Sequence, residues 1–388
     1  MDFAFTREQE QFRQEVRGFL EQELRQGTFR PREDGFWRGY SREFSRKVGE
    51  KGWIGLTWPR EYGGQGRGYL DRLVCTEEML RYGAPMEAHW MVDRQVGPSL
   101  VAFGSEQQKR EFLPKMLKAE VLFCVGFSEP DSGSDLASVQ TRATEDGDDF
   151  IINGQKIYIG LAHHADFIWL LARTDPDAPK HRGLSQFMVD LKLPGITVRP
   201  LIDMTEDHYI NEVFFDNVRV GKDCLVGEKN SAWRQILSQL NHERGDMDRL
   251  MANYCLFMDV LDYARSAHRD GQTMDAGLRS RLAELKIEFE VGRTLIYRVA
   301  WLLDKGAEPT CEASVAKAYA SEFGQRVAVA ASQILGLYGQ LTSESRLAPL
   351  DGRAVFNYLS CRMYTLGGGT SEILRSRIAI RGLGLPGN

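Results

Sequence analysis

The stretch "SEPDSGSD" at residues 128–135 combines hydroxyl and glycine positions with acidic residues, directly after the hydrophobic run "VLFCVGF". Backbone N–H groups and hydroxyls in such a turn can hold an anion or the polar edge of a ring. The stretch contains no lysine and no GxGxxG spacing, so it does not match the common phosphate-binding loops. A plain Ser/Asp/Gly turn is the alternative interpretation.

The cysteines and histidines show no metal-binding pattern. The six cysteines are scattered without a CxxC pair, and the seven histidines include one adjacent pair, His163–His164. We therefore expect reduced cysteines, no metal site and a structural or loop role for the histidine pair. The acidic segment 203–208 is interpreted as solvated surface.

Length and composition are typical of a globular protein with more than one core. The chain has 388 residues, 43% hydrophobic and 27% charged, with a net charge of −5. This charge argues against nucleic acid or an acidic membrane surface as the main partner. No apolar run reaches the roughly 18–20 residues of a membrane helix, and the N-terminus does not resemble a signal peptide. We expect a cytoplasmic protein without a membrane span or a nucleic-acid partner.

The hydrophobic pattern predicts three regions and the fold class α+β. Residues 1–120 show apolar residues at helical spacing, with a capping box at Thr6 and Gln9, and are expected to form an N-terminal helical domain. Residues 121–228 contain short β-prone runs, expected to form a middle antiparallel β-domain with a hairpin turn at Asn153-Gly154. Residues 229–388 are expected to form a C-terminal helical bundle.

The order of these regions, together with five motifs, resembles the acyl-CoA dehydrogenase family. The motifs are "GFSEPDSGSD", "GQKIYIG", "NEVFFDNVRV" with "VGEKNSAW", "QILGLYG" and "GGGTSEILRSRIAIRGLGLP". The resemblance extends from about residue 3 to residue 386. It implies a C-terminal four-helix bundle, the cofactor FAD, and α,β-dehydrogenation of an acyl-CoA thioester with an electron-transfer flavoprotein as acceptor.

The resemblance places the flavin on the opening stretch. Phe127 and Ser128 are expected at the flavin ring, and Ser134, with the N–H groups around Gly133, at the FAD pyrophosphate. A carboxylate beside a phosphate is repulsive, so Glu129 and Asp135 are interpreted as loop-bonding residues.

Two positions on the following strand depart from the family pattern. Tyr158 stands where the family usually has a tryptophan that packs on the flavin. Gly160 stands where the family usually has threonine or serine, whose hydroxyl bonds near the flavin N5. Glycine keeps the backbone N–H but loses the hydroxyl, which affects the flavin potential and the rate of hydride transfer rather than binding.

The C-terminal motifs imply the remaining cofactor contacts. Thr370 and Glu372 are expected near FAD, and Gln333 and Gly336 are expected to reach the FAD of a neighbouring subunit. Leu337 replaces the second glycine that is usual in that motif.

An arginine of the family also meets the neighbouring pyrophosphate. The segment "ARSAHRDG" offers Arg265 and Arg269, of which we select Arg269. The resemblance implies a homotetramer, with a dimer or a heteromer as alternatives.

Dehydrogenation requires a carboxylate that removes the weakly acidic α-proton while the β-hydride leaves to the flavin. In many family members this base is a glutamate two residues before the threonine of the last motif, but that position here is Gly368. A smaller branch carries the glutamate on the first long C-terminal helix, just before an arginine, and this chain reads "LNHERGD" there. Glu243 is therefore the candidate base and Arg244 its neighbour.

The helical pattern supports this assignment. Glu243 follows the apolar positions Leu237 and Leu240, which predicts a dry pocket where desolvation raises its pKa and Arg244 opposes the rise. A surface Glu–Arg pair is the alternative. By resemblance, the N–H of Gly368 and a ribityl hydroxyl of FAD polarise the thioester carbonyl.

The substrate class and two other functions stay open. The missing glutamate at position 368 leaves room for branched or steroid-side-chain thioesters, as in similar bacterial members of the family. A same-fold acyl-CoA oxidase or flavin monooxygenase is one alternative function, supported by the space that Gly160 is expected to open near N5. A non-catalytic partner subunit of a heteromeric dehydrogenase is the other.

Overall fold

The structure, a computed structural model, describes residues 4–269 and 275–387, and it groups the chain into two compact units. One unit comprises residues 1–39, 68–85 and 244–388, and the other comprises residues 40–67 and 86–243. The helices before residue 120 are thus shared between the two units. The division of the chain at residues 120 and 228 stays a prediction.

The first unit is helical. Its helices are α1 (Arg7–Gln26), α3 (Tyr69–Arg81), α8 (Asp248–Met251), α9 (Tyr254–Arg269), α10 (Ala276–Asp304), α11 (Thr310–Leu335), α12 (Arg353–Ser360) and α13 (Ser371–Arg377). Short 3-10 or π turns join them at η5 (Gly336–Gln340), η6 (Pro349–Gly352), η7 (Cys361–Thr365) and η8 (Ile378–Gly382). The predicted capping box of Thr6 and Gln9 is confirmed at the start of α1.

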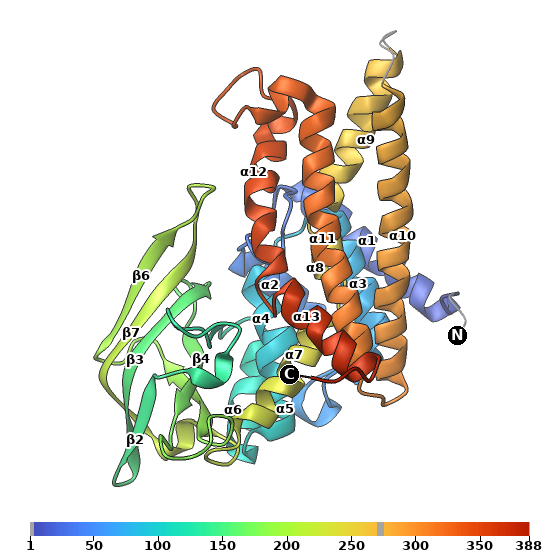
Figure 1. Cartoon of the computed structure of the whole chain (residues 1–388). Coiled ribbons are helices and arrows are strands. Elements are labelled where there is room, and N and C mark those ends of the chain that lie inside the picture. Colours follow the sequence, from blue (N-terminus) through green and yellow to red (C-terminus); the bar gives the residue numbers. More distant parts are fainter. Residues whose placement is uncertain (1–3, 270–274, 388) are drawn as a thin grey trace. The chain divides into compact units, whose positions relative to one another are not determined.

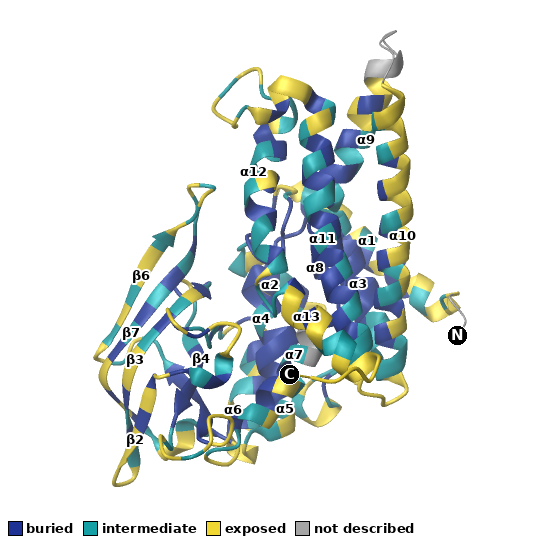
Figure 2. Ribbon diagram, viewed as in Figure 1, coloured by how far each residue is buried: buried dark blue, intermediate teal, exposed yellow. Residues whose placement is uncertain are grey.

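Helix α11 lies at the centre of the C-terminal bundle. It packs along α10, with α9 and α12 also against it, and α10 and α11 run in opposite directions (Figure 1). Figure 2 shows that α10 exposes its outer side, whereas α11 is buried over much of its length. The predicted C-terminal helical bundle is confirmed.

The second unit combines helices with a sheet. Its helices are α2 (Arg42–Glu50), α4 (Glu87–Met91), α5 (Gly97–Phe103), α6 (Glu106–Leu117) and α7 (Ala232–Arg244), of which Arg244 belongs to the first unit. Short turns are η1 (Arg60–Tyr62), η2 (Val92–Val96), η3 (Leu136–Ser138) and η4 (Lys222–Cys224). No helix in the described part of the chain combines the length and apolar character that a membrane span requires.

Eight strands form one sheet in the order β6-β7-β3-β2-β4-β5-β8, with β1 paired to β4. The strands are β1 (Phe123–Gly126), β2 (Arg142–Asp146), β3 (Asp149–Gly160), β4 (Phe167–Arg173), β5 (Leu184–Asp190), β6 (Ile196–Ile202), β7 (His208–Gly221) and β8 (Leu225–Val226). Most pairs are antiparallel, and β1 and β2 each pair with β4 in parallel. The chain makes the β2–β3 hairpin between β1 and β4, which supplies the long connection that parallel pairing needs.

The predicted hairpin turn at Asn153-Gly154 is wrong. Both residues lie inside β3, and the turn between β2 and β3 falls at Gly147, where φ is 64°. The register between β3 and β7 shifts between Ile152 and Gly154, so the Asn-Gly pair forms a β-bulge instead. A Cβ on Gly154 would lie 2.5 Å from the hydroxyl oxygen of Thr141, the residue before β2, so this close approach requires glycine there.

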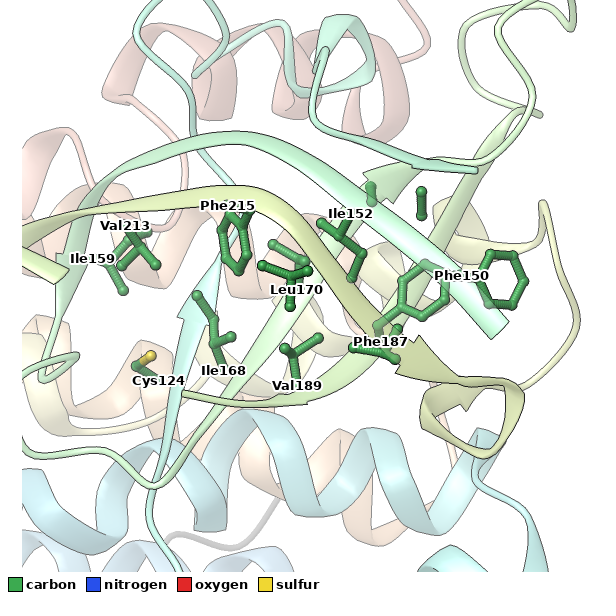
Figure 3. Close-up of a cluster of buried hydrophobic side chains, with 14 of the residues drawn as sticks. Cys124, Phe150, Ile152, Ile159, Ile168, Leu170, Phe187, Val189, Val213 and Phe215 are labelled. Atoms are coloured by element: carbon green, nitrogen blue, oxygen red, sulfur yellow. The ribbon is translucent and has the colours of Figure 1, made fainter. Parts of the chain in front are cut away.

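The core of the sheet is apolar and draws on most strands. Figure 3 shows Phe150 and Ile152 of β3, Leu170 of β4, and Phe187 of β5 among the side chains that fill it. All four are at most 1% exposed. At about 1.5–3 kcal/mol for each large buried side chain, this cluster holds the strand register on which the positions along β3 depend.

A buried carboxylate joins three helices of the first unit. The Glu77 side chain on α3 is fully buried and accepts hydrogen bonds from Arg13 of α1 at 3.0 Å and from Arg293 of α10 at 2.6 Å. The Tyr297 hydroxyl of α10 donates to it at 2.7 Å. Burial raises the pKa of Glu77, but these partners outweigh it and hold that pKa below its ordinary value. The carboxylate is thus ionised and fully paired.

Replacement of Glu77 by Gln is expected to destabilise the protein by about 3–5 kcal/mol, because it removes the buried charge that pairs with Arg13 and Arg293 and leaves Arg13 with Glu78 alone as its buried partner. The measurement is the free energy of unfolding in urea. The matched control is Glu284→Gln, which removes a carboxylate from an exposed pair with Arg281 on α10 and is expected to cost under about 1 kcal/mol. Equal losses in the two variants would contradict the role of Glu77.

A buried histidine in the second unit makes stability depend on pH. His89 of α4 is 3% exposed, and its Nδ1 lies 2.7 Å from the buried Ser45 hydroxyl of α2. Burial, followed by the charge of Arg94, lowers the pKa of His89 to about 3. Because the unfolded value is about 6.5, the unfolded chain takes up the proton first as the pH falls. His89 therefore contributes stability above about pH 6.5 that is lost progressively toward the folded pKa.

Between pH 7 and pH 5 the wild type is expected to lose about 2 kcal/mol more stability than His89→Gln, at about 1.4 kcal/mol for each pH unit below 6.5. Glutamine can still hydrogen-bond Ser45 but does not titrate. Urea unfolding of both proteins at the two pH values measures the difference. Parallel losses in both would show that His89 does not control the acid response.

Candidate active site

The loop after β1 is tied to strand β3 by a buried ion pair. The Lys156 ammonium donates to the Glu129 carboxylate at 2.8 Å and to the Phe127 carbonyl at 2.9 Å. Glu129 also accepts from the backbone N–H groups of Gln140 at 2.6 Å and Thr141 at 2.8 Å. Glu129 therefore acts within the loop, in agreement with the loop-bonding role predicted for it.

Lys156 was not among the residues predicted from the sequence. It is fully buried, and burial lowers its pKa to about 8, although Glu129 opposes the shift. The pKa of Glu129 is raised by burial but held below its ordinary value mainly by Lys156. A lysine at an inward-facing position of the run "GQKIYIG" was the available signal, since a buried lysine needs an anionic partner.

The same loop is hydrogen-bonded to the strand that carries Tyr158. The Ile157 N–H donates to the Ser128 carbonyl at 3.0 Å. The register between β3 and β7 shifts between Lys156 and Ile159, and within this bulge Tyr158 takes a φ of 60° and is 65% exposed. A bulge re-aims the side chain it contains. The result is an exposed aromatic ring on the strand to which the loop is tied.

At the end of β3, a side chain from the neighbouring strand occupies the space beside Gly160. A Cβ on Gly160 would lie 2.5 Å from the Tyr209 hydroxyl oxygen and 2.8 Å from its ring carbon Cζ. Tyr209, on β7, is 7% exposed. The expectation that Gly160 opens space is therefore wrong, because the phenol of Tyr209 fills it.

The tip of the loop is open to solvent. Gly133 and Ser134 are both exposed, and a Cβ on Gly133 would meet nothing within 4 Å. Asp135 accepts from the Ser138 hydroxyl at 2.6 Å and from Lys180 at 2.9 Å. Asp135 thus makes bonds within its own region, as predicted, and the backbone at residues 133 and 134 is accessible to a ligand.

Histidines pack beside the end of β3. His163 stacks on His208 with ring centroids 4.1 Å apart, and Asn211 bridges the two rings at 3.0 and 2.8 Å. Asn211 also donates to the Ile159 carbonyl at 2.9 Å. His164 stacks on Tyr40 at 3.9 Å. These contacts agree with the structural role predicted for the histidine pair.

In the first unit, three cationic side chains hold the carbonyls of the glycine loop 367–369. Arg244 donates from Nε to the Gly368 carbonyl at 2.8 Å, and Lys317 donates to the Gly369 carbonyl at 2.7 Å. Arg249 lies 3.5 Å from the Gly367 carbonyl, at the long limit of a hydrogen bond. All three cations are at most 5% exposed. With its carbonyls held on one side, the loop keeps its peptide N–H groups in a defined orientation.

The backbone of this loop requires glycine. Gly368 and Gly369 have φ values of 72° and 104°, in the left-handed region. A Cβ on Gly367 would lie 2.8 Å from the ring of Trp37. The Thr370 side chain then caps α13 by accepting from the Ile373 N–H at 3.2 Å. The glutamate usual at position 368 is thus replaced by a residue that fits the tight turn.

Helix α7 carries the candidate base, but its packed face differs from the predicted one. Leu237 is 37% exposed, whereas Ile236 and Gln239 are at most 1% exposed. Leu240 packs partly against the cluster around Ile236. The polar pair Gln239–Gln95, 3.0 Å apart, explains why the apolar pattern was misleading. Glu243 lies in the last turn of α7, and its side chain is outside the described residues.

The remaining predicted contacts lie on the surface of the first unit. Gln333, Gly336 and Leu337 at the end of α11 are exposed, with Leu337 84% exposed, and Glu372 is exposed in the first turn of α13. Arg265 pairs with Asp262 of its own helix at 2.9 Å. The side chain of Arg269, the last residue of α9, is outside the described residues.

The chain belongs to the acyl-CoA dehydrogenase family. It matches the acyl-CoA dehydrogenase N-terminal domain over residues 6–120, the middle domain over residues 124–218 and the C-terminal domain over residues 230–383. It is 32% identical over 400 aligned residues to acyl-CoA dehydrogenase FadE26 of Mycobacterium tuberculosis, covering 100% of this chain and 99% of the relative. The protein is thus a flavin-dependent oxidoreductase of this family, and the predicted α+β fold is confirmed.

Solved structures of similar proteins cover the whole chain. The Tcur3481-Tcur3483 steroid ACAD is 34% identical with a TM-score of 0.90, covering 100% of both chains. The ChsE4-ChsE5 complex from Mycobacterium tuberculosis is 32% identical with a TM-score of 0.85, again covering 100% of both chains. Such scores over complete chains show the same fold from end to end.

Lys317→Met is expected to lower the free energy of unfolding by about 1.5–3 kcal/mol, since it removes a charged donor from buried carbonyls. Those carbonyls belong to Gly369 and Tyr364, which accept from Nζ at 2.7 and 2.9 Å. Hydrogen exchange of the peptide covering residues 363–371 should also become faster. The control is Lys305→Met at the exposed end of α10, expected within about 0.5 kcal/mol of wild type. Unchanged exchange in Lys317→Met would show that the loop does not depend on this lysine.

Proposed function

We propose that the protein catalyses FAD-dependent α,β-dehydrogenation of an acyl-CoA thioester to the trans-2-enoyl-CoA, with Glu243 as the base. The observation that carries this proposal is the glycine loop 367–369. It lacks the glutamate that serves many family members as base, yet buried cations hold its backbone in place. The loop is therefore suited to bind a carbonyl, and the proton must be removed by another residue.

The position of residue 243 supports its role as that base. In the sequence it follows Ile236, Gln239 and Leu240 by seven, four and three residues, which is the spacing of residues that share one face of a helix. The next residue, Arg244, bonds the Gly368 carbonyl. Arg244 thus acts on the glycine loop in addition to being the neighbour of the base. A carboxylate that is removed from water can have a raised pKa that suits proton abstraction.

The glycine loop supplies the electrophilic part of the mechanism. In the proposal, the N–H of Gly368 donates to the thioester carbonyl and stabilises the negative charge that develops on its oxygen as the α-proton leaves. Arg244 and Lys317 hold the flanking carbonyls, so the loop does not need to reorganise during the reaction. The α-proton passes to the Glu243 carboxylate.

The residues of the second unit fit a flavin. The exposed ring of Tyr158 offers a surface for a planar aromatic group, and the open tip at Gly133 and Ser134 offers backbone N–H groups to a pyrophosphate. Phe127 and Ser128 lie on the segment bonded to β3. When bound, FAD accepts the hydride from the substrate β-carbon. In the proposal Thr370 and Glu372 contribute further contacts, and Arg269, Gln333 and Gly336 bind the FAD of a neighbouring subunit.

The partners follow from the same proposal. An electron-transfer flavoprotein takes the electrons from the reduced cofactor, and the chain assembles as a homotetramer or a dimer. A heteromer is the alternative, because two similar structures carry two-component names, Tcur3481-Tcur3483 and ChsE4-ChsE5. Co-purification with a second, related chain would favour the heteromer. The filled space at Gly160 removes the argument for an oxidase or monooxygenase.

The substrates are proposed to be branched or steroid-side-chain thioesters. Gly368 has no side chain beyond the backbone, which leaves room where a glutamate usually stands. The similarity to a structure described as a steroid ACAD supports this class. The proposal requires branched or ring-bearing acyl-CoAs to show a higher kcat/KM than straight-chain ones, and the reverse order would overturn it.

Glu243→Gln is expected to retain FAD but to slow anaerobic bleaching of the flavin absorbance by about 10²–10⁴-fold, because it removes the base. The measurement uses stopped-flow mixing with straight, branched and steroid-side-chain acyl-CoAs. Glu284→Gln on the exposed side of α10 is the control, and it should bleach at the wild-type rate.

A rival base can be tested in the same assay. Asp34 is a buried carboxyl of the first unit, and burial, opposed by Arg38, raises its pKa to about 7. It is 1% exposed, which leaves it no access to a substrate. If Glu243→Gln bleaches as fast as wild type while Asp34→Asn does not bleach, the assignment of Glu243 is wrong. If the wild type binds no FAD, the proposed function itself fails.

A further inference from the structure

At the end of β3, a side chain from β7 fills the space that a side chain on residue 160 would occupy. Gly160 pairs with Ile210 of β7, and the preceding residue of β7 is Tyr209. The Tyr209 hydroxyl oxygen lies 2.5 Å from where a Cβ of Gly160 would be, and its ring carbon Cζ lies 2.8 Å from it. The phenol therefore occupies the space in which any side chain at position 160 would stand.

The surroundings hold this phenol in place. Tyr209 is 7% exposed, so its ring is packed rather than free in solvent. Its neighbour on β7, His208, stacks on His163 and bonds Asn211, which in turn bonds the Ile159 carbonyl. These contacts link β7 to the last residues of β3 on both sides of the Gly160 backbone. The hydroxyl of Tyr209 is thus a fixed polar group at the end of β3.

The same end of β3 carries Tyr158, whose ring is the surface proposed for the cofactor. Tyr158, two residues before Gly160, is 65% exposed and lies on the strand bonded to the Ser128 loop. A strand residue two positions away shares a face, although the bulge at Tyr158 alters the local direction. A planar ring resting on Tyr158 would extend along the strand past Gly160.

We propose that Tyr209 supplies the hydroxyl beside the bound flavin at the end of β3, in the place of a hydroxyl on residue 160. This inference rests on the proposed function, since it assumes that FAD binds at this strand. Tyr209 is a positioning and tuning residue, because it transfers no proton or electron. Hydrogen bonds to a flavin ring stabilise one redox state over the other. The phenol therefore sets part of the equilibrium between oxidised and reduced flavin.

Tyr209→Phe removes the hydroxyl and keeps the ring. The variant is expected to bind FAD with a Kd within about twofold of wild type and to melt at a similar temperature. Its equilibrium between oxidised and reduced flavin is expected to shift about tenfold, which is about 30 mV in the midpoint potential of a two-electron couple. A dye-equilibration titration of the purified FAD-bound protein measures that potential, and the visible flavin spectrum gives a second readout.

Two further variants separate this role from simple packing. Tyr62 lies in η1, and Tyr62→Phe removes a hydroxyl that donates to Glu106 of α6. The flavin potential of this variant should equal that of wild type. Gly160→Ser alone should lose FAD, because its Cβ meets the phenol, whereas Gly160→Ser combined with Tyr209→Leu should restore both FAD binding and the wild-type potential. The wild-type potential is expected because the new serine hydroxyl takes the place of the tyrosine hydroxyl beside the flavin.

The outcomes distinguish this inference from the proposed function. If Tyr209→Phe binds FAD and shows the wild-type potential and flavin spectrum, the inference is overturned while the dehydrogenase proposal stands. The inference is also overturned, and the dehydrogenase proposal again stands, if the double variant binds FAD but keeps the shifted potential of Tyr209→Phe. If wild type does not bind FAD, both fail together.

Discussion

The buried carboxylate of Glu77 is the interaction on which the helical unit depends. It joins α1, α3 and α10, three helices that are far apart in the sequence, through arginine and tyrosine donors between 2.6 and 3.0 Å away. A buried charge is tolerated only when it is fully paired, so these helices can adopt only the arrangement that brings all the donors to it. Helix α11 packs along α10 and carries Lys317 to the glycine loop.

The glycine loop 367–369 has a fixed backbone although it carries no glutamate at position 368. Gly368 and Gly369 adopt left-handed backbone angles that other residues rarely adopt, and the conformational freedom of glycine is costly to order. Arg244 and Lys317 supply that order by binding carbonyls. The loop thereby keeps its backbone donors in a fixed orientation, and the proposed mechanism assigns proton removal to α7.

In the sheet, too, side chains from one segment fill space or supply charge at positions of another segment. At the end of β3 a glycine and a tyrosine on neighbouring strands together fill the space of one side chain. At the start of the loop, Lys156 supplies a positive charge to Glu129 within a fully buried environment. In both cases the side chain beside a motif residue comes from another segment of the chain. The folding of the strands brings the Tyr209 phenol to Gly160 and the Lys156 ammonium to Glu129.

The sequence by itself determined the family, the helical and strand regions, the absence of a glutamate at position 368 and the presence of one at position 243. These follow from local periodicity and from motifs read along the chain. The tertiary structure decided the rest. It shows that Asn153-Gly154 is a bulge and that Leu237 lies on the exposed side of α7. It also shows that Lys156 pairs with Glu129, that Lys317 binds the Gly369 carbonyl and that Tyr209 fills the space beside Gly160. The physical reason is that each of these depends on a partner from a distant segment. Strand register and helix packing bring such partners together, and a shift of one residue would turn the same side chains to the opposite face.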